Sequence, residues 1–354
     1  MLDKIITNKL IKIYQRLGNH PEWVQGGGGN VSVKISNDQM LIKASGFAFK
    51  DITEQEGLVL VNYKTIRNYF QNLSVVDGEK LEKTSTDFVI KNTINSQGGA
   101  VIRPSIETGF HSFLNKYVIH THTVYVNALA CALEAESLIR KIFENSSFQI
   151  SWVPYANPGF DLTLAVAKSV VGWSDRENNI GVFFLQNHGI IITGDDLGEC
   201  VKIHQQIDAK LKKYFNEDES YPLPKIVVVD KGFQSVTSWL EKHVNYNEID
   251  RNLFSQVLFP DQIVYLNNNA CLCTDNNCQA KVQICDQKIL YKTSRKEAQT
   301  IEETMLVYLY ILYLQKKVGL KPSVIDQKNV DYINNMEGEK YRKEILSNSK
   351  ANVI

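Results

Sequence analysis

The chain has 354 residues, of which 44% are hydrophobic, and its 39 basic side chains balance its 39 acidic ones. This is the composition of a globular protein with enough apolar side chains for a sizeable core. A net charge near zero gives no overall attraction to nucleic acid or to an anionic membrane. No apolar run reaches the length that crosses a bilayer. We therefore expect neither nucleic acid nor a membrane as a partner.

The N-terminus does not resemble a secretory signal, because Lys9 and Lys12 interrupt any apolar core. The six cysteines are unevenly spaced in a long chain, which does not indicate a disulfide framework. Both features lead us to expect a cytoplasmic protein. The length predicts two domains, or one large domain with an appendage.

The first predicted helix covers residues 3–17, because its apolar side chains recur on one stripe and Gly18 can end it. Four glycines at 26–29 then precede a strand over 31–35, which a turn joins to a partner strand over 40–44. Such glycines allow a close approach of the backbone and leave amides free for an anion; a flexible loop is the alternative. The run is neither a Walker loop nor a dinucleotide fingerprint, since no helix opens after it.

The next elements are a strand and a polar helix within residues 53–70, followed by a polar loop over 71–84. Residues 86–95 fit either a helix or a strand. Further along, helices are predicted over 125–138, 162–171 and 195–215, and strands over 148–154, 181–185 and 190–193.

The most informative segment contains two histidines in an apolar run. Tyr117 to Thr123 is rich in β-branched and aromatic residues and predicts a strand. Strand side chains alternate between faces, so His120 and His122 point the same way and form half of a metal site. The alternative is that one ring packs in the core and the other is solvated. His188 lies between two predicted strands and has the same alternative, a histidine that packs in the core.

Five segments occur in the order typical of the class II aldolase/adducin superfamily, which the chain resembles. They are GGGGNVSV at 26, LIKASG at 41, RPSIETGFH at 103, VIHTHTVYVNALA at 118 and FFLQNHGIIITGDDL at 183. The resemblance implies a three-layer α/β/α domain, which we assign to residues 1–220. It also implies a homo-oligomer, a tetramer with sites at subunit interfaces, that acts on a small sugar or sugar phosphate.

By this resemblance His120, His122 and His188 are zinc ligands, with one zinc ion per chain; another divalent metal is the alternative. Glu107 would be the transient fourth ligand and the acid/base residue. Three neutral histidines with an open position are typical of catalytic zinc, and a carboxylate beside the metal can move a proton. The resemblance implies a phosphate or polar-substrate pocket lined by Gly27, Gly29, Asn30, Ser45, Gly46 and Ser105.

The activity implied is zinc-dependent cleavage of a ketose, with a ketose 1-phosphate favoured, to dihydroxyacetone phosphate and an aldehyde. The four glycines and the length resemble the long, rhamnulose-phosphate-aldolase-like members more than the short, fuculose-phosphate type. Gly27 and Ile106 stand where aldolases of the short type carry hydroxyl residues, which removes two phosphate donors. A sugar-phosphate 4-epimerase or a decarboxylase on the same fold is the enzymatic alternative. A non-catalytic, adducin-like binding protein is the other alternative, although it has no reason to retain Glu107 and the histidines.

A small α+β appendage with a helical tail is predicted over residues 221–354, after a proline-bearing acidic segment. Its predicted elements are strands at 225–229, 263–266 and 283–284, a helix over 296–317, and a terminal helix with a frayed tail over 321–354. It also carries four cysteines, at Cys271, Cys273, Cys278 and Cys285. These could form a second zinc site, but their spacing is not that of a standard ribbon or finger and favours reduced cysteines in a hairpin.

Overall fold

The computed structural model describes residues 4–73, 78–94, 102–171, 180–243, 254, 256–267, 270–272, 280–285 and 288–348. The second zinc site, which was the alternative for the appendage, would need the side chains of Cys271, Cys273, Cys278 and Cys285, and these side chains are not among those that the structure describes. Among the helices in these ranges, none combines the length and the apolar character needed to cross a membrane.

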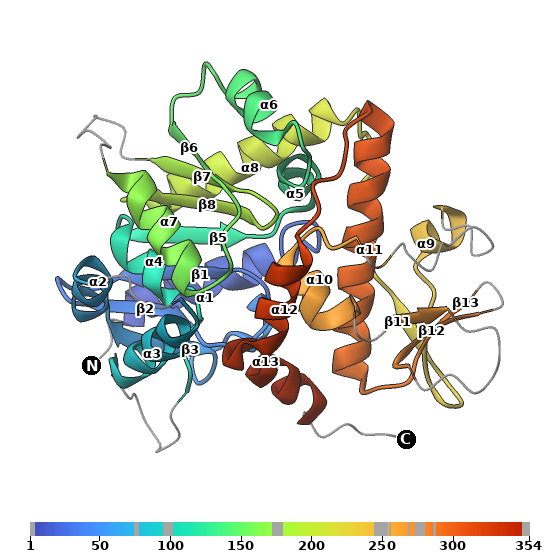
Figure 1. Cartoon of the computed structure of the whole chain (residues 1–354), viewed down its shortest axis with the longest axis horizontal. Helices are drawn as coiled ribbons and strands as arrows, with labels where there is room; N and C mark the ends of the chain where they lie inside the picture. The colour runs from blue at the N-terminus through green and yellow to red at the C-terminus, as the bar shows by residue number, and fades with distance from the viewer. Residues whose placement is uncertain are drawn as a thin grey trace.

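Eight strands of the described residues form a central sheet (Figure 1). Neighbouring strands are antiparallel except for β6 and β7, which run parallel. The strand order is β4 (Thr93–Ile94), β3 (Leu58–Asn62), β2 (Gln39–Lys43), β1 (Asn30–Lys34), β5 (Tyr117–Thr121), β8 (Gly189–Gly194), β7 (Gly181–Leu185) and β6 (Gln149–Val153).

Helices cover both faces of this sheet because its central strands are apolar on both sides. Val31 and Ile119 pack with one helical layer, whereas Val118 and Ile191 pack with the other. The first layer contains α1 (Lys4–Gly18), α5 (Val124–Ala130), α6 (Ala135–Ile142) and α8 (Leu197–Tyr214). The second contains α2 (Tyr63–Gln71), α3 (Gly78–Lys91), α4 (Thr108–Phe113) and α7 (Phe160–Val170). The predicted three-layer α/β/α architecture is confirmed.

The C-terminal part adds a second sheet and further helices, as the sequence predicts for an α+β appendage. The strand order among its described residues is β11 (Ala270–Leu272), β12 (Val282–Cys285), β13 (Lys288–Tyr291), β10 (Gly232–Ser235) and β9 (Ile226–Val229). Its helices are α9 (Ser238–His243), α10 (Pro260–Gln262), the π-helical turn Ile263–Asn267, α11 (Arg295–Val318), α12 (Gln327–Asn335) and α13 (Glu337–Asn348).

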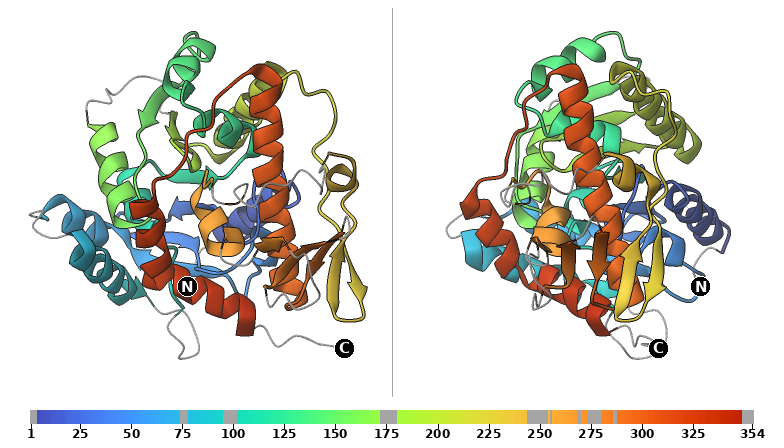
Figure 2. Two further views of the ribbon diagram at one scale, coloured as in Figure 1. Left: turned by 45° about the vertical axis from the view of Figure 1, so that its right-hand side comes forward. Right: turned by 90° about the vertical axis from the view of Figure 1, so that its right-hand side faces the viewer.

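Helix α11 joins the two parts, and Figure 2 shows it between the two sheets. It packs along α5, where Gln315 Nε2 donates hydrogen bonds to the carbonyl oxygens of Ala128 and Cys131, each at 3.0 Å. Met305 of α11 and Leu129 of α5 belong to one buried apolar cluster. The core is therefore continuous across the two parts, while the boundary near residue 220 stays a prediction.

Two local predictions in the first part are wrong. The loop expected over 71–84 includes the start of α3, which begins at Gly78. Of the ambiguous segment 86–95, residues 86–91 belong to this helix and residues 93–94 form the short strand β4. The single helix expected over 125–138 is broken between α5 and α6. The break pairs with the C-terminal part, because Leu133 N–H donates to Lys321 O at 2.9 Å and Ser323 N–H donates to Cys131 O at 2.7 Å.

Two predictions in the C-terminal part are also wrong. The strand expected over 263–266 is a π-helical turn that continues from α10 and packs against α11. A short, continuous apolar run fits a buried helix as well as a strand, so periodicity does not separate them. The tail forms two helices, α12 and α13, and within α13 Glu339 is buried.

Candidate metal centre

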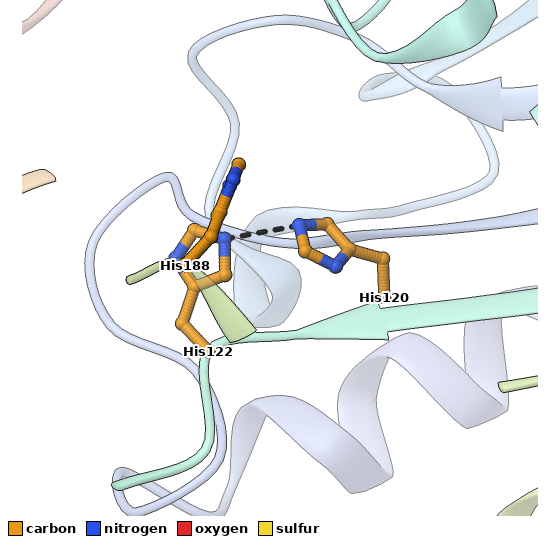
Figure 3. A group of neighbouring side chains, drawn as sticks. All are labelled: His120, His122 and His188. Atoms are coloured by element: carbon orange, nitrogen blue, oxygen red, sulfur yellow. Dashed lines mark hydrogen bonds between the residues drawn. The ribbon is translucent and has the colours of Figure 1, made fainter. Parts of the chain in front are cut away.

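The three predicted histidines lie together at the end of strand β5 (Figure 3). His120 is in β5, His122 follows its last residue, and His188 is in the turn between β7 and β8. Their ring centroids are between 4.9 and 5.2 Å apart. One ligand nitrogen of each lies within 4.8 Å of the others, and in the described part of the chain this is the one such group found.

Sheet pairing brings the turn to the end of β5. Strands β5 and β8 are antiparallel, with Thr121 opposite Ile190, so the start of β8 lies beside the end of β5. Asn187 has φ 55°, a left-handed conformation that asparagine tolerates better than most residues. Its Nδ2 donates to Leu258 O at 2.8 Å and Ser323 O at 2.7 Å, which fixes the turn that carries His188.

The hydrogen bonds of two rings determine which nitrogen is free. His120 Nδ1 lies 2.9 Å from Ile190 O, which can only accept, so Nδ1 donates. His122 Nδ1 lies 2.8 Å from Asp261 Oδ2 and donates likewise. The two Nε2 atoms then face each other at 3.1 Å. Two lone pairs repel at this distance unless a proton or a metal ion lies between them.

The electrostatics of the rings favour a cation at this point. Burial lowers the pKa of His122 to about 4, so this ring is neutral. Burial also lowers the pKa of His120, but Glu107, the hydrogen bond to Ile190 O and the charge of Asp261 together outweigh burial and hold that pKa above its usual value. His188 Nδ1 is buried and has no hydrogen-bond partner among the residues that the structure describes. The donor set therefore fits a divalent metal held by three imidazoles.

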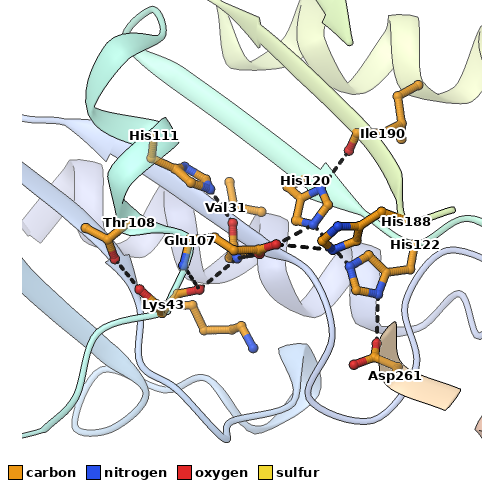
Figure 4. A network of polar contacts seen from close by, with 12 residues as sticks. Val31, Lys43, Glu107, Thr108, His111, His120, His122, His188, Ile190 and Asp261 are labelled. Carbon is orange, nitrogen blue, oxygen red and sulfur yellow. Dashed lines mark hydrogen bonds and ion pairs between the residues drawn. The ribbon is translucent and has the colours of Figure 1, made fainter. Parts of the chain in front are cut away.

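Glu107 lies across the histidines, as Figure 4 shows. Its Oε1 is 3.2 Å from His188 Nε2 and its Oε2 is 3.4 Å from His120 Nε2. Asn30 Nδ2 donates to Oε2 at 2.7 Å and orients the carboxylate. Burial raises the pKa of Glu107, but His120 and His188 outweigh it and hold that pKa well below its usual range. The carboxylate is therefore ionised beside the imidazoles.

Asn30 connects this group to a second buried histidine. Its Nδ2 also donates to Ser105 Oγ at 2.9 Å, and its Oδ1 contacts His111 Nε2. His111 Nδ1 is 2.7 Å from Ser32 Oγ. Burial lowers the pKa of His111 well below its usual range. His111 therefore supports Asn30 and lies outside the three-histidine group.

The residues expected to bind substrate share one pocket with the metal group. The space between the lining atoms is about 420 Å³. The expected residues that line it are Gly27, Gly29, Asn30, Ser45, Gly46 and Ser105, together with Glu107, His122 and His188. Their binding role stays a prediction.

Sequence reasoning missed four charged residues of this pocket, Lys43, Asp261, Glu339 and Arg342. Lys43 is buried at the end of β2, where its Nζ donates to Gly27 O and Phe47 O, each at 2.7 Å. Burial lowers the pKa of Lys43 to about 7. Lys43 lies within the LIKASG segment, which is the one local signal for it. Asp261 and the other two come from the C-terminal part, where no motif marked them.

The fold and the site together define an α/β protein with a buried three-histidine group that can hold a divalent metal. A sequence model of the family described as Class II Aldolase and Adducin N-terminal domain matches residues 8–214. The protein therefore belongs to the class II aldolase/adducin superfamily. The match leaves out the C-terminal part, which supplies Asp261 and Arg342.

Two curated relatives match about half of the chain. The first, named Uncharacterized oxidoreductase YuxG, from Bacillus subtilis (strain 168), is 28% identical over 202 residues, which cover 54% of this chain and 27% of that protein. The second is 3-oxo-tetronate 4-phosphate decarboxylase from Haemophilus influenzae. It is 24% identical over 203 residues, which cover 54% of this chain and 78% of that protein. The chain thus spans about a quarter of the first relative. Because the second is a decarboxylase, family membership leaves the reaction open.

Solved structures also resemble part of the chain. The N-terminal class II aldolase domain of a conserved protein from Thermoplasma acidophilum is 23% identical, covers 60% of this chain and 95% of its own, and has a TM-score of 0.49. An L-fuculose 1-phosphate aldolase is 22% identical, covers 65% of this chain and 93% of its own, and has a TM-score of 0.41.

Proposed function

We propose that the protein is a zinc-dependent aldolase that cleaves a ketose, with a ketose 1-phosphate favoured, to dihydroxyacetone phosphate and an aldehyde. The observation that carries this proposal is the position of Glu107 across three buried histidines in a polar pocket. Membership of a largely enzymatic superfamily supports an enzyme rather than a binding protein. A homo-oligomer, a tetramer by resemblance, and a cytoplasmic location complete the proposal.

The metal would be held by His120, His122 and His188, with Glu107 as the transient fourth ligand. Imidazole nitrogen suits zinc and its neighbours in the first transition row. When bound, the ion supplies a Lewis acid that polarises a carbonyl group of the substrate.

Glu107 is the proposed base. Aldol cleavage removes a proton from the hydroxyl of the fragment that leaves as the aldehyde, while the carbon–carbon bond breaks and its electron pair passes to the ketone fragment. An ionised carboxylate can accept that proton and return it to the other fragment. Asn30 holds Glu107 Oε2 at 2.7 Å, so the carboxylate keeps one orientation toward the pocket.

An anionic group of the substrate has donors available in the same pocket. Gly27 and Gly29 of the glycine run line it together with Ser45 and Ser105, whereas the amides of Gly26 and Gly28 already donate to Glu303 Oε2 and Gln25 O. Lys43 adds a buried amine whose pKa of about 7 allows it to be charged when an anion binds. These groups support a phosphorylated substrate, although Gly27 and Ile106 lack the hydroxyl groups of the shorter aldolases.

The test is incubation of the zinc-loaded protein with a panel of ketose 1-phosphates and free ketoses. Aldehyde release is measured for both groups, and dihydroxyacetone phosphate is measured by coupled reduction for the phosphates. Release of these products, lost in Glu107→Gln, supports the aldolase. The Haemophilus relative favours decarboxylation as the second candidate. Carbon dioxide from a 3-oxo acid phosphate without aldehyde release would select the decarboxylase, and interconversion of two sugar phosphates would select a 4-epimerase.

A further inference from the structure

A carboxylate from outside the matched domain contacts a proposed metal ligand. Asp261, in the short helix α10, lies 139 positions after His122, and its Oδ2 is 2.8 Å from His122 Nδ1. Asp261 is 6% exposed, so solvent does not compete for this contact. Figure 4 shows the carboxylate on the side of the His122 ring away from His120 and His188.

This contact determines how His122 presents its ring. A histidine that binds a metal through one nitrogen commonly donates from the other to a carboxylate, which fixes both the tautomer and the orientation. Here His122 Nδ1 donates to Asp261, and His122 Nε2 faces the Nε2 of His120 at 3.1 Å. Without Asp261, the ring is free to adopt the tautomer that carries hydrogen on Nε2, and a protonated Nε2 cannot bind a metal.

The glycine run leaves room for the contact. A Cβ atom at Gly28 would lie 2.6 Å from Asp261 Oδ2 and 2.8 Å from His122 Nδ1, closer than real Cβ atoms come. A Cβ atom at the neighbouring Gly27 would meet its nearest atom at 3.6 Å, an ordinary contact. One of the four glycines therefore serves the Asp261–His122 pair directly.

Helix α13 holds the other oxygen of Asp261. Arg342 Nη2 donates to Oδ1 at 2.9 Å, and Arg342 Nη1 donates to Glu339 at 3.0 Å. The guanidinium carbon also lies 5.3 Å from the centre of the Tyr265 ring. With both oxygens occupied, the carboxylate of Asp261 has one orientation.

We propose that the C-terminal part completes the metal centre. Asp261 is a positioning residue that keeps His122 Nε2 available, and Arg342 positions Asp261. The inference rests on the metal centre of the proposed function, and it adds a requirement that the matched domain alone does not meet.

The test compares the zinc affinity of the full-length wild type and Asp261→Asn by competition with a chromogenic chelator. The asparagine side chain cannot accept from both His122 and Arg342. We expect affinity to fall by about 10- to 100-fold, the usual effect of losing such a partner. The matched control is Glu302→Gln, another buried carboxylate of the C-terminal part, which bonds Ser235, Thr237 and Tyr291 and no histidine. Zinc affinity of the control should stay within about twofold of wild type.

Arg342→Gln provides an independent variant, and it carries the test if Asp261→Asn does not fold. We expect a smaller loss of zinc affinity, because Asp261 stays in place but loses its support. In the double variant the two losses should not add, since both act through His122. Unchanged affinity in either single variant, additive losses, or an equal loss in Glu302→Gln would overturn the inference.

The experiment distinguishes failure of this inference from failure of the proposed function. Wild-type protein that binds no zinc overturns both proposals. Weakened zinc binding in Asp261→Asn, with no cleavage of any ketose by wild type, supports the positioning role and overturns the aldolase. Ketose cleavage by wild type, with zinc affinity unchanged in Asp261→Asn, would support the aldolase and overturn the positioning role.

Discussion

Two facing imidazole nitrogens lie at the centre of the site. The Nε2 atoms of His120 and His122 are 3.1 Å apart, although both rings donate from Nδ1. Glu107 adds a negative charge on one side. Two facing nitrogens beside an ionised carboxylate, all buried, are stabilised by a cation, either a proton or a metal ion. The arrangement is therefore compatible with a bound divalent metal.

The carboxylate of Glu107 is expected to matter for turnover more than for metal retention. Glu107→Gln keeps the shape and the contact with Asn30 but removes the base. We expect zinc content close to wild type and a loss of activity of about 10²- to 10⁴-fold, measured as aldehyde release from the ketose that wild type cleaves. Activity within a fewfold of wild type would rule out Glu107 as the base.

A methyl group at Gly28 should disturb the centre, whereas one at Gly27 should not. The Cβ atom of Gly28→Ala would displace Asp261 or His122, while that of Gly27→Ala meets only ordinary contacts. We expect zinc affinity at least about tenfold lower in Gly28→Ala and unchanged in Gly27→Ala, both measured by chelator competition. Equal affinities in the two variants would show that the close approach at Gly28 has no role.

Residues of the centre differed in how far the sequence could predict them. His120, His122 and Glu107 lie in short segments whose spacing and resemblance single them out. Asp261 and Arg342 reach the site only through packing of the C-terminal part, and nothing near them in the sequence indicates this. Long-range contacts of this kind have no local pattern to read.

Among the elements, the turn between β7 and β8 determines where His188 lies. Asn187 has φ 55° there and donates to Leu258 O and Ser323 O. Asn187→Gly loses both hydrogen bonds, which removes this donor from Ser323 O and leaves Leu258 O with the weaker Cys131 thiol, at a cost of about 1–3 kcal/mol. Asn187→Ala loses the same bonds and adds about 1–2 kcal/mol of left-handed strain.

Urea unfolding should therefore rank wild type above Asn187→Gly and Asn187→Gly above Asn187→Ala. Asn216→Gly is the control, because Asn216 has φ 52° but an exposed side chain. Its free energy of unfolding should stay within about 0.5 kcal/mol of wild type. Equal stability of the two Asn187 variants would show that the turn carries no strain.

Helix α3 contacts α7 through Glu82, a half-buried acid whose charge state depends on pH. Glu82 Oε2 accepts from Phe160 N–H at 2.7 Å, and burial raises the pKa of Glu82 from 4.5 to about 7. A raised folded-state pKa adds stability that is complete below pH 4.5 and is lost as pH rises through about 7.

Glu82→Gln removes this titration and keeps an acceptor for Phe160. The free energy of unfolding of the variant relative to wild type should therefore be higher at pH 8 than at pH 4.5. Unfolding curves at a series of pH values measure the difference. A difference that does not change with pH would mean that Glu82 titrates alike in the folded and unfolded chain.

Elements with a clear period were predictable from the sequence, including α1, the pair β1 and β2, and α11. The run over 263–266 was not, because four apolar residues carry no period that separates helix from strand. The helix over 125–138 was misread for another reason. Its break is stabilised by hydrogen bonds to Lys321 and Ser323, which lie almost 200 positions away.

For the whole molecule, one buried cluster includes side chains from both sides of residue 220. Helix α11 covers α5 and contributes Met305, Ile311 and other apolar side chains to this cluster. Each fully buried side chain of this size is worth about 1.5–3 kcal/mol. A fragment that ends at residue 220 would leave this surface open to water.

We therefore expect the full chain to unfold in one transition and the fragment 1–220 to lack a cooperative transition or to melt well below it. Differential scanning calorimetry of both proteins measures this. A fragment that melts at the temperature of the full chain would show that residues 1–220 fold independently and that the shared cluster adds little.

The most direct test of the account is the metal content of the purified full chain, wild type beside His122→Ala. We predict about one zinc ion per chain in wild type and its loss in the variant, because three imidazoles are the ligands of a catalytic zinc site. Wild-type protein without metal, or a metal content that His122→Ala does not change, would contradict the three-histidine centre.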